Sequence, residues 1–454
     1  MNESRRGFSK TAIVVVLVVG ILAVIVALGR RPGDAERRLA RWTAAGFPTT
    51  PAEVNAWYAL VPASENLAPG VLDAMMAIRS NPRDTNMPVV GRGTNPPPGQ
   101  PFSKEQLRLV REFHESNAAS VEGMLKALER PRCRFSSDFS KGYMTVLPHL
   151  SPLKSAGNVL SLEARFAAEE GRGHDALKLM TNGLRLAAAV EAEPTAISGL
   201  VGSAIRNAQV AAAEHVLGQH ALDSKDLATL QSAFLTAATT TTMTPSILGE
   251  AANYSSVFYM PWRTLVTLGG GTTGSGSGDF LEESAMGFYF VSGLKNRDRR
   301  LGIRYFDDML SMSQAPVDDR ARRARKTSQE LDTTLSRGFF PIAKMLLPSL
   351  VNLGDKHIRG LCLLRAAAIA CAVERFRLAH AGTLPETLEA LVPDLLPVIP
   401  LDPWTNQPLK YRKLTPGFVI YGVGEDGKDN GGVTYANRPK GAQGGYDDAF
   451  TVGR

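Results

Sequence analysis

Cysteine, histidine and aromatic residues are scarce in this sequence. It has 3 cysteines and 7 histidines in 454 residues, and aromatic residues make up 7% of it. Three cysteines are too few for a disulfide scaffold, so we expect buried free thiols. Cys362 and Cys371 lie nine residues apart on one predicted helix, which places them on opposite faces and too far apart for a disulfide. A pairing of Cys133 with one of them is the alternative.

Motifs of nucleophilic and metal-dependent catalysis are also missing from the sequence. His215 and His220 lie five residues apart, so they do not form the His-Glu-x-x-His pattern of zinc peptidases. The sequence has no Gly-x-Ser-x-Gly nucleophile elbow and no cysteine near a histidine at the spacing of a known family. Glu169 and Glu170 would point about 100° apart on a helix, which is typical of solvated carboxylates. The sequence therefore predicts no enzymatic activity.

The charge of the chain is modest and unevenly distributed. The formal net charge is +7, with 21% charged and 44% hydrophobic residues, which is ordinary for a globular protein. Lysine and arginine cluster at residues 295–300 and 320–326. Such short clusters are more often a solvated helix face than a nucleic-acid groove, so we expect no nucleic-acid partner.

A long apolar run is present near the amino terminus. Residues 11–29 form 19 uncharged positions rich in Val, Ile and Leu, which is enough for a helix to cross a bilayer. We predict an uncleaved membrane anchor there. A cleaved signal peptide is the alternative, but Arg30 and Arg31 directly after the run disfavour it. Basic residues flank both ends, so charge alone does not fix the orientation.

The middle of the chain has the periodicity of α-helices. Thr50 is a predicted N-cap, followed by Pro51 at the first helical position and by Glu53, which completes a capping box. The proline-rich residues 91–102 must form a loop, and the glycine-rich residues 269–278 are typical of a flexible linker. The strongest helical predictions cover residues 156–170, 175–192, 197–217 and 318–335.

The last hundred residues predict a helix followed by a small antiparallel sheet. The helix covers residues 358–381, and three strands are expected at 409–412, 418–423 and 449–452. Between the last two strands lies an acidic, glycine-rich loop whose spacing does not match an EF-hand. Its oxygens nevertheless suit calcium, and a plain surface loop is the alternative. The oxygens that could converge belong to Asp426, Asp429, Asn430, Asp447 and Asp448, together with backbone carbonyls.

Three stretches of this region resemble the head of the type II secretion major pseudopilin. They lie within residues 370–385, 401–411 and 421–432, and include Leu-Asp-Pro-Trp at 401–404 and Tyr-Gly-Val-Gly-Glu-Asp-Gly at 421–427. The resemblance implies a helix packed on a small sheet and a loop that holds a structural calcium ion. It places ligands at Asp426 and at one of Asp447 or Asp448, with the Val423 carbonyl as a further candidate.

Two shorter segments resemble envelope proteins as well. Residues 6–9 (Arg-Gly-Phe-Ser), with Gly-Ile-Leu-Ala at 20–23, resemble a type IV pilin-like leader, although Ala12 stands where that family usually has glutamate. Residues 55–66 resemble a segment of large single-pass bacterial proteins that combine a helical body with the same head. That group implies no particular activity.

Together these features predict an α+β fold with a single N-terminal transmembrane helix, a long mostly α-helical body and a small pseudopilin-like head. The expected divisions are an anchor with its leader at 1–32, a helical and loop segment at 33–150, a helical body at 151–356 and the head at 357–454. We expect a structural or interaction protein anchored in the inner membrane with its body in the periplasm. It would act with envelope proteins, beside a type II secretion or pilus-like system. The alternative is an envelope hydrolase or ligand-binding protein with its site in the helical body.

Overall fold

A computed structural model describes residues 33–79, 85–261, 264, 289, 293–434 and 445–454. The helices of these ranges are α2 (Gly33–Ala44), α3 (Pro51–Trp57), α4 (Leu67–Met76), α5 (Lys104–Leu128), η2 (Phe139–Met144), α6 (Leu150–Glu169), α7 (Gly173–Glu191), α8 (Ala196–Gly218), α9 (Ser224–Thr240), α10 (Thr244–Val257), α13 (Leu294–Gln314), α14 (Val317–Arg337), α15 (Pro341–Leu346), α16 (Pro348–Ala379) and η3 (Leu388–Leu391). The strands are β1 (Lys410–Lys413), β2 (Phe418–Gly422) and β3 (Asp448–Val452).

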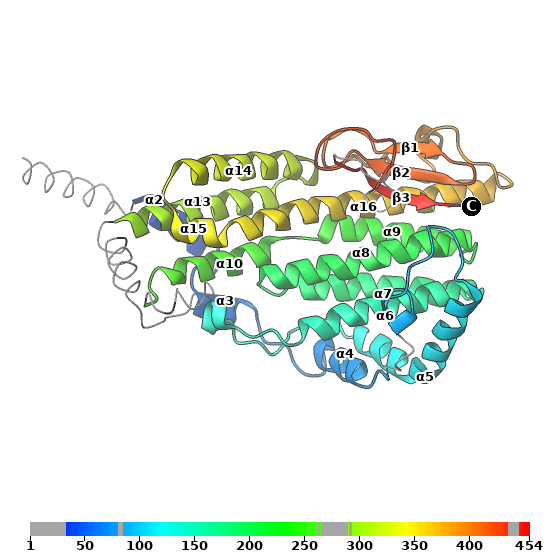
Figure 1. The fold of residues 1–454 in the computed structure, drawn as a ribbon, viewed down its shortest axis with the longest axis horizontal. Coiled ribbons are helices and arrows are strands. Elements are labelled where there is room, and N and C mark those ends of the chain that lie inside the picture. Colours follow the sequence, from blue (N-terminus) through cyan, green and yellow to red (C-terminus); the bar gives the residue numbers. More distant parts are fainter. Residues whose placement is uncertain (1–32, 80–84, 262–263, 265–288, 290–292, 435–444) are drawn as a thin grey trace, which may run out of the picture.

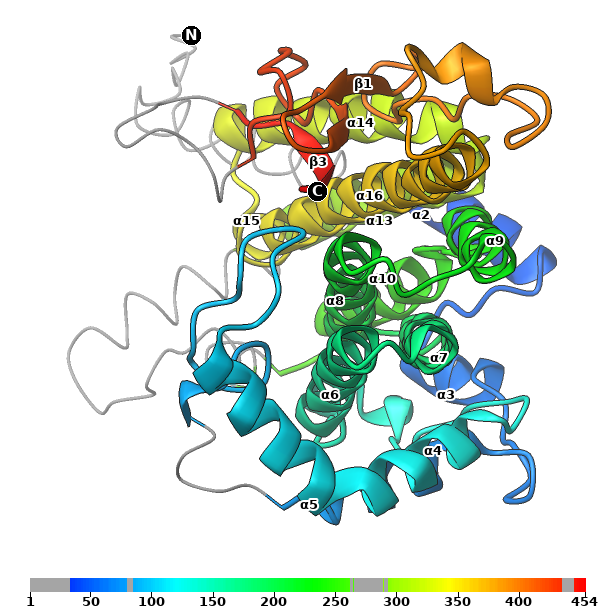
Figure 2. The same cartoon turned by 90° about the vertical axis from the view of Figure 1, so that its right-hand side faces the viewer.

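The helices stack in layers, and the sheet caps one side of the stack. Figure 1 shows α6 to α9 and α16 running side by side along the longest axis of the molecule. In the end-on view of Figure 2, α4 and α5 lie at the bottom, α6 and α7 above them, then α8 and α9, and finally α16 beneath the sheet. The sheet therefore rests on the helical body and reaches it through α16.

Helix α16 is the shared core of body and head. Its 32 residues contact α8 and α9 on one side and β2 and β3 on the other. Leu361, Leu364 and Ile369 are fully buried, and so are the small alanines among residues 366–372. Because residues 366–373 are apolar on every face of the helix, this stretch must be covered on every face, and its alanines let the neighbours approach closely. Body and head thus have one continuous hydrophobic core.

The sheet has the order β1-β2-β3, with both pairs antiparallel. Phe418 pairs with Val452 and Ile420 with Phe450, and all four side chains belong to the core formed with α16. Alternate residues of a strand point to opposite faces, and Val419 accordingly lies in a separate small cluster on the other face. β2 is therefore buried along its length, and the inner face of the sheet packs against the body.

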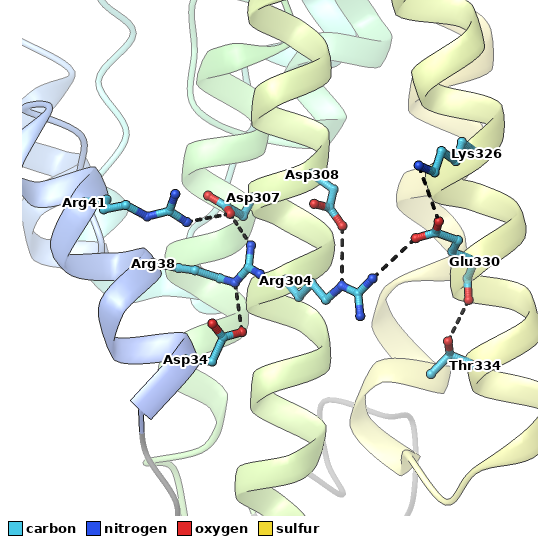
Figure 3. Close-up of polar contacts among 9 residues, drawn as sticks. All are labelled: Asp34, Arg38, Arg41, Arg304, Asp307, Asp308, Lys326, Glu330 and Thr334. Carbon is cyan, nitrogen blue, oxygen red and sulfur yellow. Dashed lines mark hydrogen bonds and ion pairs between the residues drawn. The ribbon is translucent and has the colours of Figure 1, made fainter.

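Ion pairs fix the first described helix to the body (Figure 3). Arg38 and Arg41 of α2 both pair with Asp307 of α13, and Trp42 donates its indole N–H to the same carboxylate at 2.8 Å. Figure 3 also shows Arg304 of α13 between Asp308 and Glu330, the latter on α14. Ion pairs thereby join α2 to α13 across 266 residues of sequence, and α13 to α14, which follows it directly.

The predicted fold class needs a correction, because the predicted transmembrane helix is not found among the residues that the structure describes. Within the described ranges no helix is both long and apolar enough to span a bilayer. The longest helix, α16, carries charged side chains that prevent this, among them Asp355, Arg365 and Glu374. The predicted span at residues 11–29 and the leader before it lie outside the described residues. The described part is a helical protein with one three-stranded sheet.

Several other predictions of local structure are confirmed, but the capping box predicted at Thr50 and Glu53 is not formed. The four predicted body helices correspond to α6, α7, α8 and α14, and the three predicted strands to β1, β2 and β3. Thr50 caps α3 by accepting the Glu53 N–H at 3.3 Å, whereas the Glu53 carboxylate accepts the N–H of Thr49 rather than that of Thr50. The three thiols are free, and Cys133 is only partly covered. Residues 269–278 lie outside the described ranges.

The predicted division between body and head falls inside a helix. The helix expected at residues 358–381 begins ten residues earlier, at Pro348, and so crosses the expected boundary between 356 and 357. After it, a single 3-10 turn, η3, leads toward the sheet. Body and head are connected by a rigid element rather than by a linker.

Candidate functional site

The loop that contains Trp404 joins three parts of the head. Trp404 is buried, and its indole N–H donates to Asp448 Oδ2 at 2.7 Å. The other oxygen of Asp448 pairs with Nε of Arg359, on α16, at 2.8 Å. Asp448 is the first residue of β3, so loop, sheet and helix meet at one carboxylate. Burial raises the pKa of Asp448 to about 6, against the opposing effect of Arg359.

Asp402 organises this loop, and sequence reasoning missed it as a site residue. Its carboxylate accepts the N–H of Trp404 at 2.9 Å, the hydroxyl of Thr405 at 3.1 Å and the N–H of Val423 at 3.1 Å. The first two bonds close a turn of the kind that Asp forms with residues just after it. The Asp-Pro pair was a visible signal for that turn. The third bond, to Val423 after β2, had no signal in the sequence.

Gly422 is the point where the loop, β2 and α16 approach most closely. A Cβ at this position would lie 2.6 Å from Sγ of Cys362 and 2.8 Å from Cγ of Asp402. Both distances are shorter than real Cβ contacts allow, so glycine is required by space. The Tyr-Gly-Val run noted in the sequence therefore serves close packing at this position.

The predicted calcium ligands are all in or beside the loop that precedes β3. Asp447 is buried and accepts the N–H groups of Asn430 and Gly432, the second at 2.6 Å. Burial raises the pKa of Asp447, although these N–H groups act in the opposite direction. The Asp447 carboxylate thereby closes the loop against the sheet.

The remaining predicted ligands have separate surroundings. Asp429 accepts the Gly431 N–H at 2.9 Å and pairs with Lys410 at 3.1 Å, and the pKa of Asp429 is lowered, chiefly by the Gly431 N–H. Asp426 is exposed and accepts the N–H of Lys428. Val423 donates its N–H to Asp402, as described above.

As placed, these residues do not fit a calcium ion. The carboxylates of Asp429, Asp447 and Asp448 are each occupied by donors from the protein. In the part of the chain that the structure describes, no group of three or more acidic, histidine or cysteine side chains could hold a metal ion. Calcium binding stays a prediction from the resemblance, and no role in the site is derived from it.

Two cavities flank Trp404. The larger, about 560 Å³, lies between the first turns of α14 and residues 403–406 of the loop. The smaller, about 360 Å³, is lined by Trp404 together with Asp355, Arg359, Glu425 and Asp448. Burial and the neighbouring Glu425 raise the pKa of Asp355 to about 6. Trp404 therefore separates the larger groove, in which basic side chains outnumber acidic ones, from the smaller groove, in which acidic side chains outnumber basic ones.

Arg325 lines the larger cavity and lies over Trp404. The centre of its guanidinium is 5.1 Å from the centroid of the indole ring, within the range of a cation–π contact. Its Nη2 is 3.5 Å from the carbonyl oxygen of Gly424. One side chain of the basic run at 320–326, which was interpreted from the sequence as a solvated face, thus contacts the head.

Histidines of the body pair with buried glutamates. His149 contacts Glu193 at 2.9 Å, and the same oxygen accepts the hydroxyl of Ser198 at 2.6 Å. This order differs from a catalytic triad, in which the histidine contacts the hydroxyl and the carboxylate orients the histidine. The contacts are buried and join α8 to the preceding loops.

The carboxylates of Glu169 and Glu170 diverge, as their spacing predicts. Glu169 binds His215 at 2.8 Å, and Glu170 pairs with Arg111 at 2.7 Å on another helix. Each carboxylate has a structural partner, so the two do not act on a common point.

Comparisons with protein-family models, with curated proteins and with solved structures find no match to the chain. The resemblance to the pseudopilin head therefore rests on the residues quoted above. The groove beside Trp404 is the candidate functional site on its own geometry.

Proposed function

We propose that the chain is a non-enzymatic structural or interaction protein that acts outside the cytoplasm, beside a type II secretion or pilus-like system. In this proposal the helical body holds the head rigidly and presents the groove between α14 and residues 403–406 to another protein. The extracytoplasmic location and the secretion context are supported by the resemblance of residues 401–411 and 421–432 to the pseudopilin head. The interaction role is supported by the groove.

The observation that carries the proposal is the Arg325–Trp404 pair on a rigid support. Tryptophan and arginine are enriched among residues that dominate binding energy at protein interfaces. Here the indole is fixed by Asp448 at 2.7 Å, and the guanidinium lies over it. Side chains that are already fixed lose little conformational entropy when a partner binds, which favours affinity.

A small-molecule binding protein is the second candidate. The groove volume of about 560 Å³ is within the usual range for such sites. A ligand in this groove would lie between body and head, whereas the sequence predicted a ligand site inside the helical body.

Site-specific photo-crosslinking in intact cells tests the proposal. A photoreactive amino acid at Gln329, exposed and lining the groove, is compared with one at Lys225, exposed on α9. We expect a discrete product at Gln329 whose partner is identified as an envelope protein and whose yield falls in Trp404→Ala. Equal products at both positions, or none at Gln329, would contradict the interaction role.

The location is tested separately by thiol labelling. Cys362 and Cys371 are buried, and burial raises the pKa of Cys133 to about 12, so the native thiols react slowly. A cysteine introduced at Lys225 should therefore give the main signal with a maleimide that cannot cross the inner membrane. Absence of labelling in cells with a permeabilised outer envelope, with full labelling after lysis, would contradict an extracytoplasmic location.

A further inference from the structure

We infer that the groove between α14 and residues 403–406 binds an acidic peptide segment of a protein partner, in which a carboxylate side chain lies next to an apolar residue. This inference rests on the proposed function and specifies the chemistry of the partner. It is drawn from the charges and contacts that line the groove.

The groove wall on α14 is a single basic face of the helix. Arg325 and Lys326 lie three and four residues after Arg322, so the three side chains occupy neighbouring positions on the helix surface. The adjacent face of the helix, with Ala321 and Ala324, is buried. The packing of α14 therefore sets which side of the helix carries the basic residues, and that side lines the groove together with residues 403–406.

The two acidic side chains in the groove already have cationic partners. Asp319 pairs with Arg322 at 2.5 Å, and Asp318 pairs with Arg365 of α16 at 2.9 Å. Two other cations that line the groove, Arg325 and Lys326, therefore remain to interact with an occupant.

The first of these cations is Arg325. Its Nε is buried, so an occupant can reach only the terminal nitrogens, and the contact of one of these, Nη2, with the Gly424 carbonyl is long, at 3.5 Å. The second is Lys326, which is 77% exposed and 4.0 Å from Glu330 (Figure 3). A guanidinium held by an aromatic ring, with unused N–H groups, is well suited to carboxylates, which it binds through two parallel hydrogen bonds.

The other wall of the groove selects for more than charge. Pro403 and Trp404, both largely buried, line this wall, and the exposed Asn406 adds a polar amide. A volume of about 560 Å³ exceeds what a single carboxylate fills. A short peptide with an acidic residue beside an apolar one would use both walls.

A selection with a random heptapeptide library displayed on phage tests the inference on the full chain. The library is first depleted on Arg325→Glu and then selected on the unsubstituted protein. Enriched peptides are synthesised, and their affinities are measured by fluorescence anisotropy. Variants are Arg325→Glu, Arg325→Lys and Lys326→Glu. The matched control is Arg323→Glu, the same charge change on the same helix at an exposed residue outside the groove.

We expect enrichment of aspartate or glutamate next to an apolar residue, and at least tenfold weaker binding to Arg325→Glu. Lys326→Glu should weaken binding several-fold without changing the melting temperature, since its side chain is mostly exposed. Arg323→Glu should bind as the unsubstituted protein does. Replacing the acidic residue of the peptide by its amide should abolish the preference.

Several outcomes would overturn the inference. These are an absence of acidic enrichment, equal binding to Arg325→Glu and to Arg323→Glu, and tighter Arg325-dependent binding of a DNA oligonucleotide than of any peptide. If the crosslinking experiment identifies an envelope partner while this selection fails, the groove chemistry is wrong and the proposed function survives. If both fail, the interaction role itself is wrong.

Discussion

The indole nitrogen of Trp404 donates to Oδ2 of Asp448 at 2.7 Å, across 44 residues of sequence. This bond ties the loop after α16 to the first residue of the last strand. Because Asp448 is buried, its oxygen has no solvent to replace a missing donor. The bond therefore fixes the indole ring that lines both cavities.

Removing the indole donor should destabilise the protein. Trp404→Phe keeps most of the apolar volume but leaves a buried carboxylate oxygen without this partner. We expect the free energy of unfolding to fall by about 1–3 kcal/mol, measured by urea denaturation of the full chain. Trp57→Phe, at a tryptophan that is 36% exposed, is the control and should change stability much less. Equal effects of the two substitutions would show that the Trp404–Asp448 bond contributes little.

Gly422 should not tolerate a side chain. In Gly422→Ala the new Cβ would lie 2.6 Å from Sγ of Cys362, and we expect a loss of about 1–3 kcal/mol from overpacking. Adding Cys362→Ala should recover part of that loss, because it removes the closer of the two contacts. Gly123→Ala is the control: nothing lies within 4 Å of its Cβ position, and a helical Gly-to-Ala change should stabilise by about 0.5–1 kcal/mol.

Glu214 should make stability depend on pH. It accepts the Thr451 N–H at 2.8 Å, and burial raises the pKa of Glu214 from 4.5 to about 7. A raised pKa means that the folded protein binds this proton more tightly than the unfolded chain does. The stabilisation is therefore complete below about pH 4.5 and lost as the pH rises through about 7.

Glu214→Gln should remove this dependence, because its amide stays neutral and its oxygen can still accept the Thr451 N–H. Near pH 4.5 we expect the variant and the unsubstituted protein to have the same free energy of unfolding. Above pH 7 the free energy of unfolding of the variant should be higher by up to about 3 kcal/mol. Chemical denaturation across that range measures the difference. Glu122→Gln, at an exposed glutamate of α5, is the control. If the difference in unfolding free energy from the unsubstituted protein does not change with pH for either variant, the prediction is contradicted.

The head should not fold without the body. Residues 357–454 contain only part of α16, and the inner face of their sheet shares its core with α6 to α9. We expect this fragment to give a poorly dispersed amide spectrum by NMR and no cooperative melt. The full chain under the same conditions provides the reference. A well-dispersed spectrum from the fragment would show that the head is an independent domain.

Calcium provides a test of the pseudopilin resemblance. The resemblance predicts that calcium stabilises the head through Asp426 and one of Asp447 or Asp448. From the contacts of Asp447 and Asp448 with protein donors, we expect the melting temperature of the full chain to be the same in calcium and in chelator. A rise of several degrees with calcium, lost in Asp426→Ala, would overturn this expectation and support the resemblance.

Much of the fold could be predicted because it depends on local patterns. Helical periodicity located α6, α7, α8 and α14, a continuous apolar run at 418–421 located β2, and the Thr50–Pro51 pair located the start of α3. These signals come from residues that are neighbours in the chain, where geometry is set by the backbone itself.

The site could be predicted only in part, because its contacts join distant residues. The acidic residues before β3 were recognised by their chemistry, but their partners were not. Asp402 meets Val423 across 21 residues, and Arg325 meets Gly424 across 99. Nothing in a single sequence indicates which donor will reach a given carboxylate. The groove escaped prediction for the same reason, since one of its walls is a body helix and the other a head loop.

The order in which the elements are made has a consequence for biogenesis. Among the described elements, strand β3 is made last, yet it contacts both α8 and α16. Until β3 emerges, the apolar side of α16 that faces the sheet has no complete cover. The nascent chain therefore exposes apolar helix surface from the emergence of α16, which ends at Ala379, until Asp448 begins β3. A chaperone that holds such surfaces would have its main task in this interval.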